Sequence, residues 1–212
     1  MVGGFGVSDI YLADIGNTHI HIYCDGAIEH FTHQRAIELY GDKRIFFISV
    51  KDRLKIPKNW VDISSDIYID GEYSTMGVDR KALCLSYRSG IFVDAGSAIT
   101  IDVVKDGIYQ GGTICLGIKA MLNGYKNISK ALDIELDRKI DISKLHTTTK
   151  EQISYGIIAS IKSIIDINRG TLPLYLTGGD GRLLAQFFDD AIYDESLVFQ
   201  GMNKILKDKG II

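Results

Sequence analysis

Long apolar segments and an excess of basic residues are both missing from this chain of 212 residues. No run of about 18 consecutive apolar residues occurs, so we expect no transmembrane helix and no membrane partner. No basic segment followed by an apolar stretch and a cleavage site opens the sequence, which disfavours secretion. Lys and Arg number 24 against 27 Asp and Glu, and they are scattered, so nothing indicates a nucleic-acid partner.

Cysteine is scarce, and the usual metal-binding spacings of cysteine and histidine are absent. Cys24, Cys84 and Cys115 are odd in number and lie in apolar surroundings, which predicts reduced core thiols and a cytoplasmic location. Neither CxxC nor HExxH occurs, so we expect no structural zinc site. His19 and His21 share one face of a predicted strand. A two-histidine metal site is the alternative there, but positions that face solvent are favoured.

Two common nucleotide-binding motifs are incomplete. Gly4-Phe5-Gly6 lacks the further glycine of a dinucleotide-binding fingerprint, and no strand precedes it. The run from Gly111 to Gly117 resembles the start of a P-loop, but Ile118 stands where the lysine is required. We therefore expect neither site, and we leave the small, Gly-rich segment 1–6 out of the expected fold.

A short acidic, glycine-containing segment occurs twice. Asp14-Ile15-Gly16-Asn17-Thr18 recurs as Asp94-Ala95-Gly96-Ser97-Ala98, and Asp25-Gly26 recurs as Asp106-Gly107. Each copy predicts a β-hairpin, in which an apolar strand ends in an acid and a glycine turn leads to a second strand. Such a turn lets backbone amides approach a phosphate, and the acid can hold a divalent cation. One copy alone favours an ordinary hairpin, whereas two in register favour a phosphate-binding site.

A turn that opens a predicted helix lies between the two copies. In Gly77-Val78-Asp79-Arg80, preceded by Tyr73, the carboxylate can accept a proton from a hydroxyl and the guanidinium can bind a carboxylate or phosphate. The alternative is structural, since Asp is favoured in a first helical turn and Arg is usually solvated. Thr177-Gly178-Gly179-Asp180-Gly181 predicts a second turn, from strand to helix, where a ligand can approach the backbone; a plain turn is its alternative.

Periodicity predicts an α/β protein with mixed sheets, divided near residue 89 into domains 1–88 and 89–212. In the helix expected at 150–168, isoleucines at helical spacing predict a buried stripe, and Gly170 a stop. Strands are expected at 9–14, 18–24, 27–32, 44–50, 66–70, 91–94, 97–104, 107–114 and 171–176. Helices are expected at 33–40, 78–88, 119–132, 150–168, 182–188 and 196–208.

These motifs, in their order and spacing, resemble those of the type III pantothenate kinases, a family of the actin, Hsp70 and sugar-kinase superfamily. The resemblance covers nearly the whole chain from Asp9 onward, and the combination of the first hairpin turn with GxDR is its most specific part. It implies two tandem ribonuclease-H-like (actin-like ATPase) domains and a homodimer with a shared active site. It also implies ATP-dependent phosphorylation of pantothenate to 4'-phosphopantothenate in coenzyme A biosynthesis, with Mg²⁺ and with K⁺ or NH₄⁺.

The resemblance also implies roles for particular residues. Asp79 would accept the proton of the substrate hydroxyl, Asp94 would bind the monovalent cation, and Asp14 would act on Mg²⁺ indirectly. ATP would contact Asp14, Ile15, Gly16, Asn17, Thr18, His19, Ile20, His21 and Ser97. Pantothenate would contact Tyr73, Gly77, Val78, Asp79, Arg80 and Thr149.

Some alternatives stay open at this stage. Thr147 and Thr148 compete with Thr149 for the position that reaches the neighbouring subunit's site. A non-catalytic relative, such as an accessory factor for transcription, would keep the fold without turnover. A kinase of the same superfamily could act on another small molecule.

Overall fold

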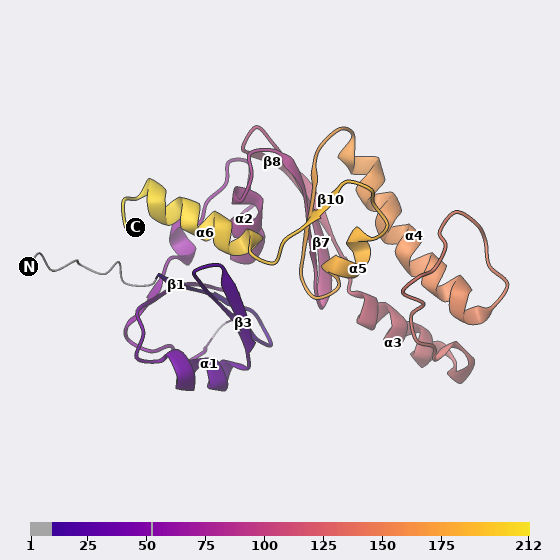
Figure 1. Ribbon diagram of the computed structural model, residues 1–212, viewed down its shortest axis with the longest axis horizontal. Coiled ribbons are helices and arrows are strands. Elements are labelled where there is room, and N and C mark those ends of the chain that lie inside the picture. The colour runs from indigo at the N-terminus through magenta and orange to yellow at the C-terminus, as the bar shows by residue number, and fades with distance from the viewer. Residues whose placement is uncertain (1–9, 52) are drawn as a thin grey trace, which may run out of the picture. The chain divides into compact units, whose positions relative to one another are not determined.

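The computed structural model describes residues 10–51 and 53–212, which form two compact units (Figure 1). One unit combines the described chain up to Ser86 with Ser196–Ile212, and the other is Tyr87–Glu195. Each unit is built on one five-stranded sheet. Segment 1–6, left out of the expected fold, lies outside the described residues.

The sheet of the first unit is a three-stranded antiparallel meander extended by two parallel strands. Its order is β3-β2-β1-β4-β5, with β4 parallel to β1 and β5 parallel to β4. Its strands are β1 (Tyr11–Ile15), β2 (Ile20–Cys24), β3 (Ala27–Phe31), β4 (Ile45–Ser49) and β5 (Trp60–Asp62).

Helices cover both faces of this sheet (Figure 1). On one side, Ala36 of α1 (His33–Tyr40) packs in a core with Ala13, Ile15 and Ile20. On the other side lie α2 (Val78–Leu85) and α6 (Leu197–Asp208). The one-turn 3₁₀ helix η1 (Ser64–Asp66) follows β5.

The second unit repeats the topology of the first. Its order is β10-β9-β6-β7-β8, in which β6, β7 and β8 form the antiparallel meander and β9 and β10 the parallel extension. Its strands are β6 (Gly90–Ala95), β7 (Ala98–Lys105), β8 (Ile108–Leu116), β9 (Leu174–Thr177) and β10 (Ala191–Tyr193).

The two turns that follow the repeated hairpins match in backbone conformation. Asp25 and Gly26 have φ of 47° and 85°, and Asp106 and Gly107 have φ of 53° and 83°. Two successive residues with positive φ form the tight turn that suits the right-handed twist of antiparallel strands. The repeat predicted from sequence is therefore confirmed in both strand order and turn geometry.

Helices α3 (Ile118–Ile128), α4 (Thr149–Arg169) and α5 (Gly181–Ala185) belong to the second unit, where Figure 1 shows α3 and α4 on one side of the sheet. A single 3₁₀ turn, η2 (Lys130–Leu132), follows α3. The predicted isoleucine stripe of α4 is buried except at Ile164, which is half-buried. Asn168, at the end of the stripe, is exposed and donates to the carbonyl of Ile164. Gly170, with φ of 55°, ends the helix as predicted. The buried members of the stripe are Ile153, Ile157, Ile161 and Ile165.

Helix α6 corrects the expected extent of the second domain, because it packs in the first unit. Gly201 lies so close to α2 that a Cβ there would be 1.8 Å from the carbonyl oxygen of Ala82. The ring of Phe199 stacks on Tyr23 of β2, with centroids 5.2 Å apart. The close approach of α6 to α2 at Gly201 requires a residue without a side chain.

One predicted strand is wrong, and two short strands were missed. The strand expected at 66–70 is absent, and the chain instead forms η1 and an isolated bridge at Asp70. The parallel strands β5 and β10 were not predicted, because each has only three residues and shows no periodicity. Each is held by its pairing with a longer neighbour, β4 or β9.

The cysteine prediction is confirmed in part. None of the three cysteines is in a disulfide, but only Cys84 is buried, while Cys24 and Cys115 are half-buried. Among the described residues, no helix has both the length and the apolar character that a membrane span requires.

Candidate active site

The turn between β1 and β2 presents an acid and several polar groups at the end of the first hairpin. Asp14 is half-buried and lies in register with His21. The amide of Gly16 donates to the carbonyl of His19 over 3.0 Å, which closes the turn. Residues 17–19 are exposed. The turn can therefore offer amides, a hydroxyl and an imidazole to an anion.

Ile15 and Ile20 belong to the predicted ATP segment, but their side chains point elsewhere. Both are fully buried and pack in the core that includes Ala36 of α1. Because side chains alternate along a strand, the polar neighbours of these isoleucines lie on the opposite face. These two positions can serve a ligand only through their backbone.

Two cationic or polar side chains that sequence reasoning did not single out contact this turn. Nζ of Lys51 donates to the carbonyl of Asn17 over 2.9 Å, and Nε2 of His33 lies 2.9 Å from the carbonyl of Gly16. Lys51 follows β4, whose carboxyl end lies beside that of β1 because the two strands are parallel. Only this strand pairing could have identified Lys51, and the sequence does not show it.

His19, which precedes β2, and His21, on β2, differ in environment. His19 is exposed, as expected. His21 is half-buried, and its Nδ1 lies 2.5 Å from Nδ1 of His30, its register partner on β3. Within residues 10–51 and 53–212 no group of three or more His, Cys, Asp or Glu side chains is placed to hold a metal ion.

The Gly77 to Arg80 turn holds its acid and its arginine in defined positions. Gly77 is the N-cap of α2, and Oδ1 of Asp79 accepts from the amide of Arg80 over 2.8 Å. Arg80 is only 6% exposed, and its Nη1 donates to the hydroxyl of Tyr73 over 2.5 Å. The interpretation of Arg80 as a solvated surface group is therefore wrong. Val78 is half-buried.

The second hairpin turn lies directly against the turn that follows β9. The amide of Asp180 donates to the carbonyl of Ala95 over 2.9 Å. Gly178 has φ of 84°, and a Cβ on it would lie 2.4 Å from Oδ1 of Asp94. The Thr177 to Gly181 segment therefore packs against Asp94, which a plain strand-to-helix turn does not require.

The glycine that follows β8 packs on the same hairpin turn from another side. The amide of Gly117 donates to the carbonyl of Ser97 over 3.1 Å. A Cβ on Gly117 would lie 2.4 Å from the carbonyl oxygen of Gly96. The glycine is thus needed for close approach to the Ser97 turn. Gly111 and Gly112 lie within β8, consistent with the rejection of a P-loop.

Oxygen-bearing side chains line up across three strands at Asp94. Thr100 on β7 and Thr177 on β9 are its register partners. Thr177 is buried, and the Oγ1 atom of Thr100 is buried with no hydrogen-bond partner among the described residues. Carboxylate and hydroxyl oxygens are the ligands that hard cations prefer, so these residues fit such a cation.

Thr149 is the first residue of α4, and its neighbours have different tasks. Thr148 caps the helix, because its Oγ1 accepts from the amide of Glu151 over 3.4 Å and also donates to the Glu151 carboxylate. Thr147 and Thr149 are exposed. Of the three threonines, Thr148 is the one committed to the helix cap.

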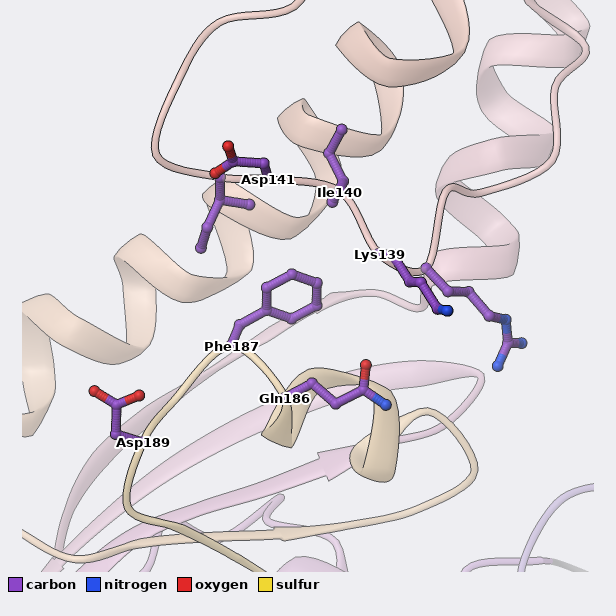
Figure 2. Close-up of a pocket in the computed structure, with 8 residues that line it drawn as sticks. Lys139, Ile140, Asp141, Gln186, Phe187 and Asp189 are labelled. Atoms are coloured by element: carbon purple, nitrogen blue, oxygen red, sulfur yellow. The ribbon is translucent and has the colours of Figure 1, made fainter.

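A pocket of about 380 Å³ occurs elsewhere in the second unit (Figure 2). Figure 2 shows the ring of Phe187, from the chain after α5, pointing toward the loop that carries Ile140. No residue predicted for the site is among those that line this pocket in the described chain. The lining residues are Arg138, Lys139, Ile140, Asp141, Ile142, Gln186, Phe187 and Asp189.

Comparison with known proteins identifies the family. The family model for type III pantothenate kinase matches residues 42–168. The type III pantothenate kinase of Helicobacter hepaticus is 38% identical over 201 residues, which cover 92% of this chain and 98% of that relative. A Campylobacter jejuni protein of solved structure, described provisionally as a conserved Baf family transcriptional activator, is 33% identical with a TM-score of 0.87, covering 96% of this chain and 100% of its own.

A more distant structure shares the fold alone. The activator of 2-hydroxyisocaproyl-CoA dehydratase from Clostridium difficile, solved with ADPNP, has a TM-score of 0.57 at 10% identity, covering 96% of this chain and 98% of its own. The expectation of an α/β fold with two tandem ribonuclease-H-like domains of the actin-like type is thereby confirmed. With the family match over 42–168 and the identity over nearly its full length, this chain belongs to the type III pantothenate kinase family.

Proposed function

We propose that this protein transfers the γ-phosphoryl group of ATP to the hydroxyl of pantothenate, forming 4'-phosphopantothenate in the first step of coenzyme A biosynthesis. Family membership supports this reaction. The observation that carries the assignment of the acceptor site is the buried Arg80, tied to Tyr73 and adjacent to Asp79. A buried arginine beside a carboxylate suits an acceptor that has both an anionic end and a hydroxyl.

On the acceptor side, each residue of the turn has a distinct task. The guanidinium of Arg80, which donates to the hydroxyl of Tyr73, binds the carboxylate of pantothenate. Asp79 orients the hydroxyl and accepts its proton late, because an alcohol is too weak an acid to ionise beforehand. Gly77 and Val78 supply backbone against which the substrate lies.

On the nucleotide side, the first hairpin turn binds the phosphates of ATP through its amides and through the polar side chains of residues 17–19. Lys51, which already contacts the Asn17 carbonyl, adds positive charge next to the turn. Ser97 contacts ATP from the second hairpin turn. Asp14, at the end of β1, supplies the carboxylate that acts on Mg²⁺ through its water shell.

Asp94 binds K⁺ or NH₄⁺, with Thr100 and Thr177 as neighbouring oxygen donors. The buried hydroxyl of Thr100, which no described group contacts through a hydrogen bond, supports this assignment. When bound, Mg²⁺ and the monovalent cation neutralise negative charge on the phosphate oxygens. The protein's own contribution is the alignment of acceptor and donor, which provides most of the catalysis in a loose transition state.

The active form that we propose is a cytoplasmic homodimer in which α4 of one subunit reaches the site of the other. Thr149 makes this contact. Thr147 is the alternative, whereas Thr148 is committed to capping α4.

A coupled assay of ADP release tests the reaction. ATP and pantothenate, with and without K⁺, are expected to give turnover that depends on both pantothenate and K⁺. Asp79→Asn keeps an oxygen that can accept from the Arg80 amide, so the fold is retained while kcat falls by about 10²-fold or more. Asp70→Asn, which changes an exposed carboxylate, is the matched control.

The assay also separates the two alternatives. A folded dimer that binds ATP without pantothenate-dependent ADP release would be an accessory relative, of the kind suggested by the description of the Campylobacter protein. ADP release with another small alcohol, but not with pantothenate, would indicate a kinase of different specificity. Near-normal turnover of Asp79→Asn would remove Asp79 from its proposed role.

A further inference from the structure

The substrate-side residues of the first unit all lie on one short segment, 73–80, which runs from Tyr73 to the start of α2. The two residues that flank this segment carry opposite charges: Glu72 precedes it and Lys81 follows it. Nζ of Lys81 donates to Oε1 of Glu72 over 2.7 Å. The ion pair therefore joins the two ends of the segment.

Glu72 is also held by hydrogen bonds to the backbone of Ile69. Its Oε2 accepts from the amide of Ile69 over 3.0 Å, and its amide donates to the carbonyl of Ile69 over 3.1 Å. Both oxygens of the Glu72 carboxylate therefore accept hydrogen bonds, one from the amide of Ile69 before the segment and one from Lys81 after it. The carboxylate links the chain before Tyr73 to the first turns of α2.

The burial of this pair distinguishes it from ordinary surface ion pairs. The side chains of Lys81 and Glu72 are 16% and 15% exposed. Charge-assisted hydrogen bonds in partly buried sites are stronger than those at the surface, and loss of one partner leaves the other charge desolvated. The pair is thus suited to fix a distance rather than only to solubilise the surface.

Contacts inside the segment determine what this closure positions. The amide of Met76 donates to the carbonyl of Tyr73 over 3.0 Å, and the amide of Lys81 donates to the carbonyl of Gly77 over 3.1 Å. Between these two turns, Nη1 of Arg80 donates to the hydroxyl of Tyr73. The Lys81–Glu72 ion pair adds a second link at the base of the segment, which brings the chain at Tyr73 and the first turn of α2 together.

We propose that Glu72 and Lys81 are a positioning pair, which holds Tyr73 at the distance from Arg80 that binding of the carboxylate-bearing acceptor requires. This inference rests on the proposed acceptor site. The pair acts on binding of the acceptor, not on ATP, because the proposed nucleotide turn joins β1 and β2 and lies outside segment 73–80.

Steady-state kinetics of Lys81→Met test the proposal. The KM for pantothenate is expected to rise by about tenfold, the effect of losing one charge-assisted hydrogen bond, while the KM for ATP changes by less than about twofold. Lys81→Arg keeps the charge and is expected to restore most of the affinity for pantothenate. Asp66→Asn breaks an ion pair with Lys209 in the same unit and is the matched control, with both KM values unchanged.

A second variant keeps the test decisive if Lys81→Met does not fold. Glu72→Gln combined with Lys81→Met removes both charges, so no unpaired carboxylate remains buried, and the KM for pantothenate is expected to rise in this variant as well. A lowered unfolding temperature with an unchanged KM for pantothenate would show that the pair is only structural. Absence of pantothenate-dependent ADP release in the unsubstituted protein would instead remove the proposed function, and with it this inference.

Discussion

Gly178 is the position at which a single methyl group should disturb both the fold and the cation response. Its φ of 84° is in the left-handed region, and a Cβ there would lie 2.4 Å from Oδ1 of Asp94 and 2.7 Å from the carbonyl oxygen of Ala95. Gly178→Ala therefore faces backbone strain and two overlaps at once. One of those overlaps is with backbone, which cannot rotate away.

The magnitude follows from these two effects. A left-handed conformation costs an alanine about 1–2 kcal/mol, and forcing a methyl group into filled space costs about 1–3 kcal/mol. We expect Gly178→Ala to lower the free energy of unfolding by about 2–5 kcal/mol, the sum of the two. The methyl group also displaces the carboxylate of Asp94. The K⁺ concentration for half-maximal turnover should therefore rise.

The matched control is the next residue. Gly179→Ala places a Cβ that no described atom approaches within 4 Å, so its unfolding free energy should change by less than about 1 kcal/mol. Urea unfolding and a K⁺ activation curve, measured on both variants, check the expectation. Equal stability and equal K⁺ response of the two variants would refute the reasoning.

Three further predictions concern the first unit. A Cβ at Gly201 would lie 1.8 Å from the carbonyl oxygen of Ala82. Gly201→Ala should therefore lower the free energy of unfolding, measured in urea, by about 1–3 kcal/mol. A change near zero would contradict the close packing of α6 on α2. The hydrogen bond to Glu29 and, second, burial raise the pKa of Tyr40 from 10.0 to about 12. The folded state therefore holds the phenol proton more tightly than the unfolded state does. The free energy of unfolding should fall as pH rises from about 10 through 12. Tyr40→Phe should lessen that fall in unfolding experiments across this range, and an identical pH profile would count against it. Lys51→Met should raise the KM for ATP by about 3- to 10-fold in the coupled assay, as expected for one lost charged contact. The KM for pantothenate should not change. Equal effects on both KM values would exclude a specific role of Lys51 in nucleotide binding.

Local sequence accounts for much of the fold, because several elements carry their own periodicity and stop signals. Helix α1 begins and ends where the sequence predicts, and the repeated Asp-Gly turns have the same left-handed backbone in both copies. The isoleucine stripe of α4 needs only the 3.6-residue period of a helix. By contrast, β5 and β10 have three residues each, too few to show a period, and exist through pairing with β4 and β9.

The same division holds for the candidate site. The sequence by itself determined the two acidic turns, the Asp79–Arg80 turn and the family resemblance, since each depends on residues that are neighbours along the chain. Tertiary structure alone decided that Arg80 is buried on Tyr73, that Lys51 contacts the first turn, and that Gly178 packs on Asp94. These contacts join segments far apart in sequence or fix a side chain's solvent exposure, and no local pattern encodes which strand ends or turns will meet once the sheets form.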